Sequence, residues 1–319
     1  MRRSGPGGLF ILEPGLVFLN HGSFGARPRE LLEEQDRFRR MAEAEPVRFL
    51  ARSSGALIEA ALGALAAYLG ASPRDLAFVE NATTAVGIAA RSLALEPGDE
   101  VIGTDHEYGA CAEAWRRVCE ARGASYRSIA VPLPYAGHGD FLARLEGAIG
   151  PRTRALFVSQ ITSPTALELP AAEVCALARR LGLVSVIDGA HVPGQLELEL
   201  GKLGADFYAG NCHKWLCAPL GSAFLYVREG LHEGVVPPVV SWGLVDEANG
   251  TDFHEAYAGS FPLARRLRWL GTRDISAFLA VPAAIDFCRR QADEARKCAT
   301  LAAETARRAA ALLGLESLA

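Results

Sequence analysis

The sequence predicts an α/β protein, a three-layer α/β/α sandwich built on a mostly parallel sheet. Two observations predict it. Between residues 76 and 188, five short apolar runs alternate with helical segments, which is the pattern of parallel strands joined by right-handed crossovers. Half of the 319 residues are hydrophobic, so the chain can bury a large core.

The first elements are predicted to be helices that follow a start rich in glycine and proline. Residues 28–45 and 52–70 have helical patterns, and the second is rich in alanine and leucine and ends at Gly70. Strands are expected at the apolar runs 76–80, 100–104, 125–131, 154–159 and 183–188. Helices are expected to follow them at 83–95, 110–122, 141–149 and 171–181.

Two further apolar runs, 206–210 and 222–227, follow without a helix between them. They are predicted to pair antiparallel at an edge of the sheet. The tail from 276 to 319 is rich in alanine and is expected to be helical. We therefore divide the chain into an N-terminal segment, 1–27, a large domain, 28–260, and a small C-terminal domain that starts at 261 and runs to 319.

Composition and charge argue against several partners. The 33 basic and 37 acidic residues are mixed along the chain and give a net charge of −4, so no basic stripe for nucleic acid is expected. Glu13 and Pro14 interrupt the first apolar run before a signal-peptide core is complete, and no uninterrupted apolar stretch reaches about 18 residues. Neither nucleic acid nor a membrane is therefore expected as a partner.

The seven cysteines are an odd number scattered through a long chain, which indicates free thiols in a reducing compartment. A cytoplasmic location is the expectation. Cys212 and Cys217 flank Lys214, but no His/Cys cluster has the spacing of a zinc site, so no metal is expected and these two thiols are interpreted as buried apolar fillers.

Polar residues follow the strands at their carboxyl ends, where open parallel sheets bind ligands. After 76–80 comes a turn with Thr83 and Thr84 that opens a helix, and its free N–H groups can bind an anion such as phosphate. An ordinary threonine N-cap is the alternative. After 100–104 come His106 and Tyr108, which can lie over a planar ligand or can be solvated or core-edge groups.

The next two strand ends carry a polar turn and an acid. Ser163 lies in the turn 160–165, which can hydrogen-bond a substituent on a ligand's ring. Asp188 ends an almost wholly apolar strand, and His191 follows three residues later. Because an isolated buried carboxylate is costly, Asp188 needs a cationic partner, either a protonated pyridinium nitrogen or an arginine in a structural ion pair.

The chain has three lysines, and one of them lies in an apolar setting. Lys202 and Lys297 have charged or polar neighbours, whereas Lys214 follows His213 and precedes Trp215 and Leu216. A desolvated lysine can lose its proton and attack a carbonyl, which an arginine cannot do. The alternative is a lysine whose apolar stem covers the surface while its ammonium reaches water.

These functions converge on one cofactor. An anion-binding helix start, a stacking side chain, a buried acid and a desolvated lysine are all expected at one edge of the sheet. Pyridoxal 5′-phosphate (PLP) requires these four functions, because it needs a phosphate site, a ring platform, a carboxylate that keeps the ring nitrogen protonated and an amine for the Schiff base. The sequence therefore predicts PLP as the cofactor.

At these residues the sequence resembles the class V aminotransferase family of fold-type I PLP enzymes, in its isopenicillin N epimerase-like branch. The match is carried by LNHGSFGARP (19–28), DHEYGA (105–110), VSVIDGAHVPG with NCHKWLCAPLGSAFLYV, and GTRDISAFLAVPAAIDF (271–287). The specific part is an Asp-x-x-His followed about 20 residues later by His-Lys. The resemblance runs over nearly the whole chain.

The resemblance implies roles for the site residues. Lys214 is similar to the Schiff-base lysine, Asp188 to the partner of the pyridine nitrogen, and His191 to the group beside O3′. Thr83, Thr84 and His213 are similar to phosphate ligands, and Thr272 lies in a segment that reaches the phosphate of the neighbouring subunit in a homodimer. His106 or Tyr108 stacks on the ring, and Tyr108 is also a candidate acid or base. The residues that line the substrate entrance are Asn20, His21 and Ser23.

The resemblance also implies the activity. We expect a PLP enzyme that acts at the α- or β-carbon of an amino acid, epimerase-like or a C–S lyase, with a class V aminotransferase or a cysteine desulfurase-like enzyme as alternatives. The family's substrate-binding arginine lies in a small C-terminal domain that is incomplete here, so a truncated, incompetent protein with a PLP fold is a further alternative. None of the cysteines lies where desulfurases carry their nucleophile. A dinucleotide-binding enzyme is disfavoured because no G-x-G-x-x-G follows the first strand.

Overall fold

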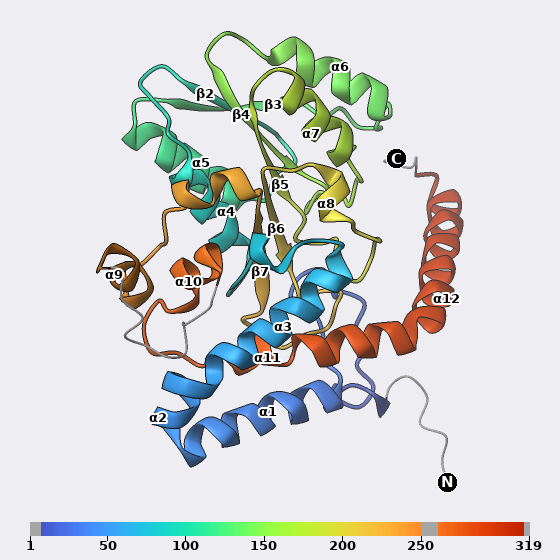
Figure 1. Ribbon diagram of the computed structural model, residues 1–319. Coiled ribbons are helices and arrows are strands. Elements are labelled where there is room, and N and C mark those ends of the chain that lie inside the picture. The colour runs from blue at the N-terminus through green and yellow to red at the C-terminus, as the bar shows by residue number, and fades with distance from the viewer. Residues whose placement is uncertain (1–7, 250–260, 316–319) are drawn as a thin grey trace.

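A seven-stranded sheet crosses the protein in the order β1-β7-β6-β5-β4-β2-β3 (Figure 1). The computed structural model describes residues 8–249 and 261–315. The strands are β1 Leu76–Val79, β2 Glu100–Thr104, β3 Ser125–Ile129, β4 Thr153–Ser159, β5 Val184–Asp188, β6 Phe207–Asn211 and β7 Ala223–Val227. The predicted α/β fold with a mostly parallel sheet is confirmed.

Only β7 runs against the other strands. The pairs β2·β3, β2·β4, β4·β5 and β5·β6 are parallel, whereas β7 is antiparallel to β6 on one side and to β1 on the other. The predicted antiparallel pairing of the last two strands is therefore confirmed, but their predicted edge position is wrong. All five residues of β7 are buried and apolar, which suits an interior strand, and β1 takes the edge beside it.

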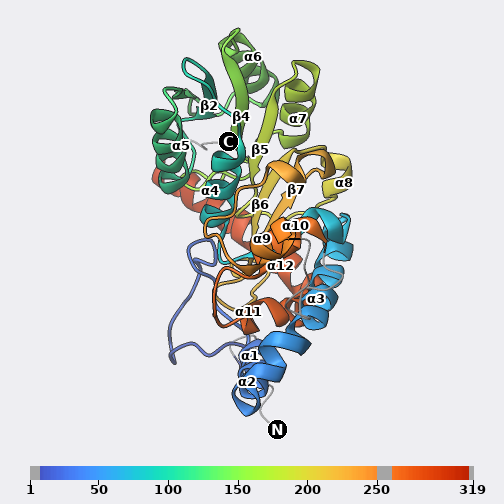
Figure 2. The same cartoon turned by 60° about the vertical axis from the view of Figure 1, so that its left-hand side comes forward.

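Helices cover both faces of the sheet, as the turned view in Figure 2 shows. One face is covered by α3 Ser54–Leu69, α6 His138–Ala148 and α7 Ala171–Arg180. The opposite face is covered by α4 Ala82–Ser92, α5 Gly109–Ala121 and α10 Pro262–Arg268. Each face has its own apolar cluster, with Leu65 and Tyr208 in the first and Trp115 and Phe157 in the second. These are the three layers that the alternating pattern predicts.

The other helices are α1 Arg29–Ala44, α2 Pro46–Arg48, α8 Leu200–Leu203, α9 Trp242–Asn249, α11 Ser276–Leu279 and α12 Val281–Leu313. The structure also has a π-turn, Phe49–Ser53, and 3₁₀ turns at Pro73–Asp75 and Glu229–Gly234. The helical tail expected from 276 onward is confirmed as far as the described residues reach, and it is divided into two helices at Ala280. Pro282 lies in the first turn of α12, and a proline there has no N–H with which to continue the preceding helix.

The segment Pro46–Leu69 is long and apolar enough to cross a membrane by length and composition, although 44% of its most apolar window is buried inside the protein. Such burial is typical of a helix in the core of a globular domain. Its α3 part contributes Leu62, Leu65 and Leu69 to the core. The expected cytoplasmic location stays a prediction.

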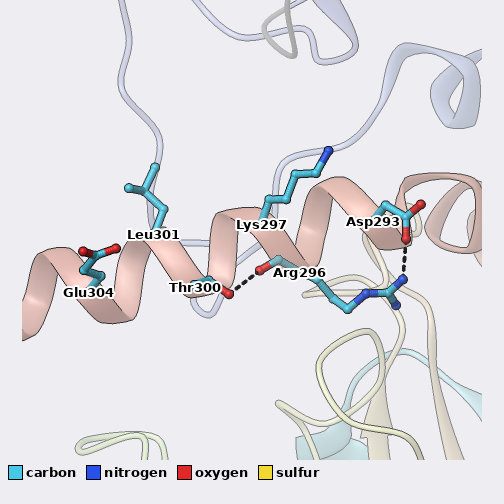
Figure 3. Close-up of a pocket in the computed structure, with 6 residues that line it drawn as sticks. All are labelled: Asp293, Arg296, Lys297, Thr300, Leu301 and Glu304. Atoms are coloured by element: carbon cyan, nitrogen blue, oxygen red, sulfur yellow. Dashed lines mark hydrogen bonds and ion pairs between the residues drawn. The ribbon is translucent and has the colours of Figure 1, made fainter.

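The helix α12 packs only through its first turns. Val281, Ala284, Ile285 and Phe287 are buried, whereas the later side chains lie in solvent. Figure 3 shows this outer face, where Leu301 is 64% exposed. The predicted boundary at residue 260 lies outside the described residues, so the division into a large and a small domain stays a prediction.

Burial gives a matched pair of leucines for a test of the core. Leu65→Ala is expected to lower the free energy of unfolding by about 3 kcal/mol, because Leu65 is 0% exposed and its removal leaves a cavity. Leu301→Ala is expected to change it by less than about 0.5 kcal/mol. Urea unfolding of both variants measures the difference, and equal losses would contradict the assignment of the core.

Candidate active site

The strand ends bring the predicted acid and amine together. Asp188 ends β5 and is the Cα partner of Ala209 in β6, and Lys214 follows the end of β6. The charge of each acts on the pKa of the other, so the two groups lie near each other at this edge of the sheet. His191 lies three residues after Asp188 and contacts the amine directly.

A chain of two hydrogen bonds orients the amine. Lys214 Nζ lies 3.0 Å from His191 Nε2, and Trp215 Nε1 donates to His191 Nδ1 at 3.4 Å. An indole nitrogen can only donate, so Nδ1 of His191 is the acceptor and the proton of the neutral ring is on Nε2. His191 then directs an N–H at Lys214, and the nitrogen accepts it when the amine is neutral.

The electrostatics of the site agree with this arrangement. Burial, helped by the charge of Lys214, lowers the pKa of His191 to about 4, so its ring is neutral at pH 7. Burial also lowers the pKa of Lys214, and the charges of Asp188 and Cys111 oppose it only in part. The neutral amine is the form that attacks a carbonyl.

Asp188 is 3% exposed and is held by local donors. Its Oδ1 accepts from the backbone N–H of Ala190 at 2.9 Å, and the thiol of Cys111 hydrogen-bonds to it. Burial raises the pKa of Asp188, while these contacts and the charge of Lys214 lower it. No arginine among the described residues forms an ion pair with Asp188, which disfavours the structural ion pair that the sequence left open.

The start of α4 offers donors beside this pair. Asn81 caps the helix, because its Oδ1 accepts from Thr84 N at 2.8 Å and from Thr84 Oγ1 at 3.1 Å. The alternative of a threonine N-cap is therefore wrong, and Asn81, which the sequence analysis overlooked, is marked by its place three residues before Thr84. Asn211 accepts from Ala82 N at 2.8 Å. In the described part of the chain, Thr83 N–H meets no acceptor and stays available for an anion.

His213 is buried beside the amine. Its Nδ1 donates to the carbonyl oxygen of Ser222 at 3.0 Å, which leaves Nε2 free to face a ligand. Burial lowers the pKa of His213, so the ring is neutral in this environment. The role of a phosphate ligand stays a prediction for His213, as for Thr83 and Thr84.

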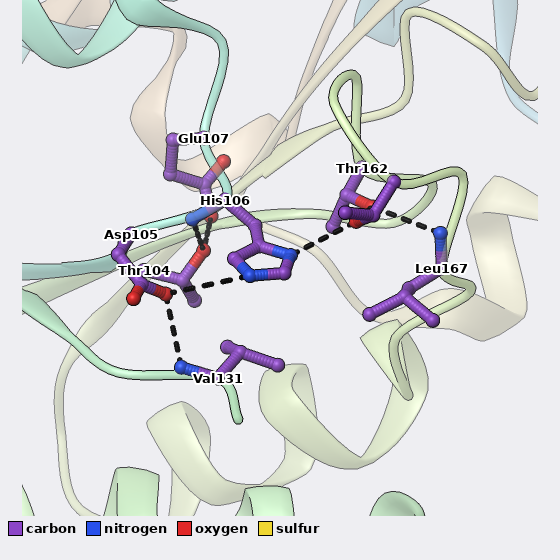
Figure 4. A network of polar contacts seen from close by, with 8 residues as sticks. Thr104, Asp105, His106, Glu107, Val131, Thr162 and Leu167 are labelled. Atoms are coloured by element: carbon purple, nitrogen blue, oxygen red, sulfur yellow. Dashed lines mark hydrogen bonds and ion pairs between the residues drawn. The ribbon is translucent and has the colours of Figure 1, made fainter. Parts of the chain in front are cut away.

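His106 and Tyr108 differ in their environment. His106 is buried, and its Nδ1 lies 2.9 Å from Thr165 Oγ1, which in turn lies 2.8 Å from Thr162 Oγ1 (Figure 4). Tyr108 is 48% exposed at the start of α5. Ser163 is exposed, and its side chain has no hydrogen-bond partner among the residues that the structure describes. In this turn Thr165 contacts His106, and Thr162 supports Thr165.

The N-terminal segment lies against the lysine. Gly25 has φ +70°, and a Cβ on it would lie 2.7 Å from the carbonyl oxygen of Lys214, so only glycine fits there. The ring of His21 stacks on Trp215 at 5.9 Å between centroids, whereas Asn20 and Ser23 hydrogen-bond to each other at 2.8 Å. Thr272 lies exposed between α10 and α11.

Trp215, Cys111 and Glu107 contact this site or its supports, and the sequence did not single them out. Trp215 orients His191, and Cys111 hydrogen-bonds to Asp188. Glu107 is buried between Thr104 and Ser159. Of these three, only Glu107 could have been singled out from the sequence. It is an acid that follows a buried strand, and such an acid, like Asp188, needs a partner to stabilise it.

The small number of lysines allows the amine to be titrated. With ¹³C-methylated lysines, the NMR signal of Lys214 is expected to titrate at lower pH than the signals of Lys202 and Lys297, because only Lys214 is desolvated. Trp215→Phe should raise the pKa of Lys214, since His191 Nδ1 loses its donor and Nε2 can then accept from an ammonium. Lys214→Arg assigns the signal, and coincident titration of all three lysines would contradict the inferred neutral amine.

Comparison with known proteins agrees with this geometry. The isopenicillin N epimerase of Streptomyces clavuligerus is 42% identical over 281 residues, which are 88% of this chain and 71% of that protein. A probable chloroplastic L-cysteine desulfhydrase of Arabidopsis thaliana is 30% identical over 87% of this chain and 59% of its own length. The structure of the cystine C–S lyase C-DES with its product cysteine persulfide has a TM-score of 0.74 and 26% identity, and covers 86% of this chain and 72% of that one. The family model for class-V aminotransferases matches residues 19–317, and the chain belongs to this family.

Proposed function

We propose that this chain is a PLP-dependent enzyme that acts on an amino acid as an epimerase or a C–S lyase. The observation that carries the proposal is the amine of Lys214, 3.0 Å from a neutral His191 and facing the buried Asp188. Relatives named isopenicillin N epimerase and L-cysteine desulfhydrase support the two reactions, and a C-DES structure with glycine linked to its PLP supports the cofactor.

The chemistry of the available groups fits this cofactor. Lys214 supplies the amine, Asp188 a carboxylate, and the start of α4 supplies Thr83 N–H with the hydroxyl groups of Thr83 and Thr84 for a phosphate. His106 is the better ring platform of the two candidates, because it is buried and hydrogen-bonded while Tyr108 is exposed. Bound PLP would supply an electron sink for the negative charge that develops on the substrate's α-carbon.

The residues of the chain move the proton. Lys214 in its neutral form takes the α-proton of the amino acid, and the desolvation that lowers its pKa favours this form. His191, 3.0 Å from the amine, holds it in place beside the strand ends. Asp188 holds a negative charge at the strand end, which stabilises a protonated ring nitrogen.

The two reactions diverge once the α-proton has been removed. Epimerisation needs a second group that returns a proton to the opposite face of the α-carbon, whereas C–S lysis needs the departure of sulfur from the β-carbon. Tyr108, exposed near His106, is the candidate for the second group. A Tyr108→Phe variant that loses inversion at the α-carbon but still releases thiol would assign the tyrosine to epimerisation. A class V aminotransferase would be recognised by a different product, a keto acid that keeps its sulfur.

The shared chemistry has a direct test. Lys214→Ala is expected to remove the visible absorption of PLP bound through lysine and to slow α-proton exchange in heavy water by ~10³-fold, because the base is lost. Lys202→Ala, which removes an exposed lysine, should keep both properties. PLP binding by the native chain without any exchange would support the inert alternative.

We also propose a homodimer. Several large apolar side chains of the N-terminal segment lie in solvent, with Val17 78%, Leu19 84% and Phe24 73% exposed. They flank the residues predicted to line the substrate entrance, and the exposed Thr272 is expected to reach the partner's phosphate site.

Sedimentation is expected to give twice the chain mass of 34.0 kDa. Leu19→Glu should raise the dimer dissociation constant at least ~10-fold, because it places an unpaired charge in an apolar contact. Leu181→Glu, on the outer end of α7, is the matched control. A native chain that sediments as a monomer would refute the dimer without touching the chemistry of Lys214.

A further inference from the structure

Glu107 is a second buried acid at the edge of the sheet, and the mechanism above does not use it. Its Oε1 accepts from the hydroxyl of Thr104 at the end of β2, at 2.7 Å (Figure 4). Its Oε2 accepts from the hydroxyl of Ser159 at the end of β4, at 2.5 Å. The carboxyl therefore bridges two neighbouring strands at the point where they end. Ser159 is the Cα partner of Asp188, so this bridge lies one strand away from Asp188.

The bridge also supports the histidine that is expected to stack on the ring. Thr104 Oγ1, while it donates to Glu107, accepts from the backbone N–H of His106 at 3.2 Å. His106 is thus fixed by Thr104 at its backbone and by Thr165 at its ring. A change at Glu107 would be felt at His106 through the hydroxyl of Thr104.

Among the described residues, the titratable groups that act on the charge of Glu107 are acids. Asp188 faces it from β5, Cys111 from α5 and Tyr126 from β3, and each of these can only add negative charge. Of the cations around these groups, Arg116 lies over the ring of Tyr126 at 5.7 Å and pairs with Glu113, and Lys214 acts on Asp188 and Cys111. Glu107 forms no ion pair among the residues that the structure describes.

Two buried carboxyl groups so placed cannot both be charged at low cost. The charge of a protonated Lys214, the N–H of Ala190 and the thiol of Cys111 favour the charged form of Asp188, whereas Glu107 has the hydroxyl groups of Thr104 and Ser159 and the backbone N–H of Ser159. Burial raises the pKa of Glu107 from its ordinary 4.5 to about 7, and the charge of Asp188 adds to the rise. The negative charge therefore goes to Asp188.

We propose that Glu107 is a positioning residue that remains a neutral carboxylic acid, bridges β2 and β4, and so adds no second buried negative charge beside Asp188. In the neutral acid Oε2–H of Glu107 would donate to Ser159, in place of the hydrogen bond that the Ser159 hydroxyl donates to the carboxylate. If Glu107 also ionised, its repulsion would favour protonation of Asp188 and weaken the hold on a cationic ring nitrogen. This consequence rests on the proposed function, whereas the protonation of Glu107 does not.

The test compares the native chain with Glu107→Gln, which keeps the shape and the hydrogen bonds of a neutral acid. A carboxyl whose pKa is raised on folding stabilises the folded state fully below pH 4.5, and this contribution is lost as pH rises to about 7. Without added PLP, the Tm of the native chain should therefore fall relative to that of Glu107→Gln between pH 5 and 7 and stay parallel above it. Glu173→Gln, at an exposed glutamate of α7, should show no such trend.

Infrared spectra give a second readout that a purely structural role would not move. The native-minus-Glu107→Gln difference at pH 6 should contain the C=O stretch of a protonated carboxyl, and the band should disappear toward pH 8. In an Asp188→Asn background the midpoint should move to lower pH, because the neighbouring charge is gone.

Three outcomes would overturn the proposal: Tm curves that stay parallel from pH 5 to 8, no protonated band at pH 6, or a midpoint indifferent to Asp188→Asn. All are measured without the cofactor, so failure here is distinct from failure of the proposed reaction. Glu107→Ala, which leaves Thr104 and Ser159 without their shared partner, should lower Tm at every pH.

Discussion

The contact between Lys214 and His191 is the interaction on which the rest of the site depends. It joins the end of β6 to the turn after β5, and it is set by Trp215 on the far side of the imidazole. An amine in water keeps its proton far above neutral pH. To favour the neutral form of Lys214, the site must exclude water and direct a hydrogen-bond donor at the nitrogen. The apolar sequence around Lys214 supplies the first, and the tautomer of His191 supplies the second.

The chemistry at the strand ends was more predictable from the sequence than the arrangement of the sheet. Asp188 and Lys214 stood out because each is a costly residue in an apolar run, and such residues need a local explanation. The place of β7 between β6 and β1 depends on pairing across about 150 residues, which the local pattern of 222–227 does not encode. The tail from 276 could be predicted as helical from its alanine content, whereas the place of the break before α12, at Pro282, needed the structure.

The hydrogen bonds of the site could not be predicted from the sequence, because they join residues that meet only in the folded protein. The direction of a hydrogen bond at His191 depends on which donor reaches Nδ1, and Trp215 is adjacent to Lys214 in sequence but meets His191 across the turn. Asn211 occupies the first N–H of α4 from a distance of 129 residues. Such contacts form only when the strand ends come together. Among the described residues, Thr83 keeps a free N–H because Asn211 and Asn81 accept from its neighbours Ala82 and Thr84, and no sequence motif indicates this.

The close fit of Gly25 against the carbonyl oxygen of Lys214 has a bearing on biosynthesis. This segment leaves the ribosome almost 190 residues before the lysine on which it docks, and it has no permanent surface to rest on until β5 and β6 exist. The contact of Gly25 with the carbonyl oxygen of Lys214 can therefore form only after β6 has been synthesised and placed in the sheet, which makes it a late contact in the folding of this domain.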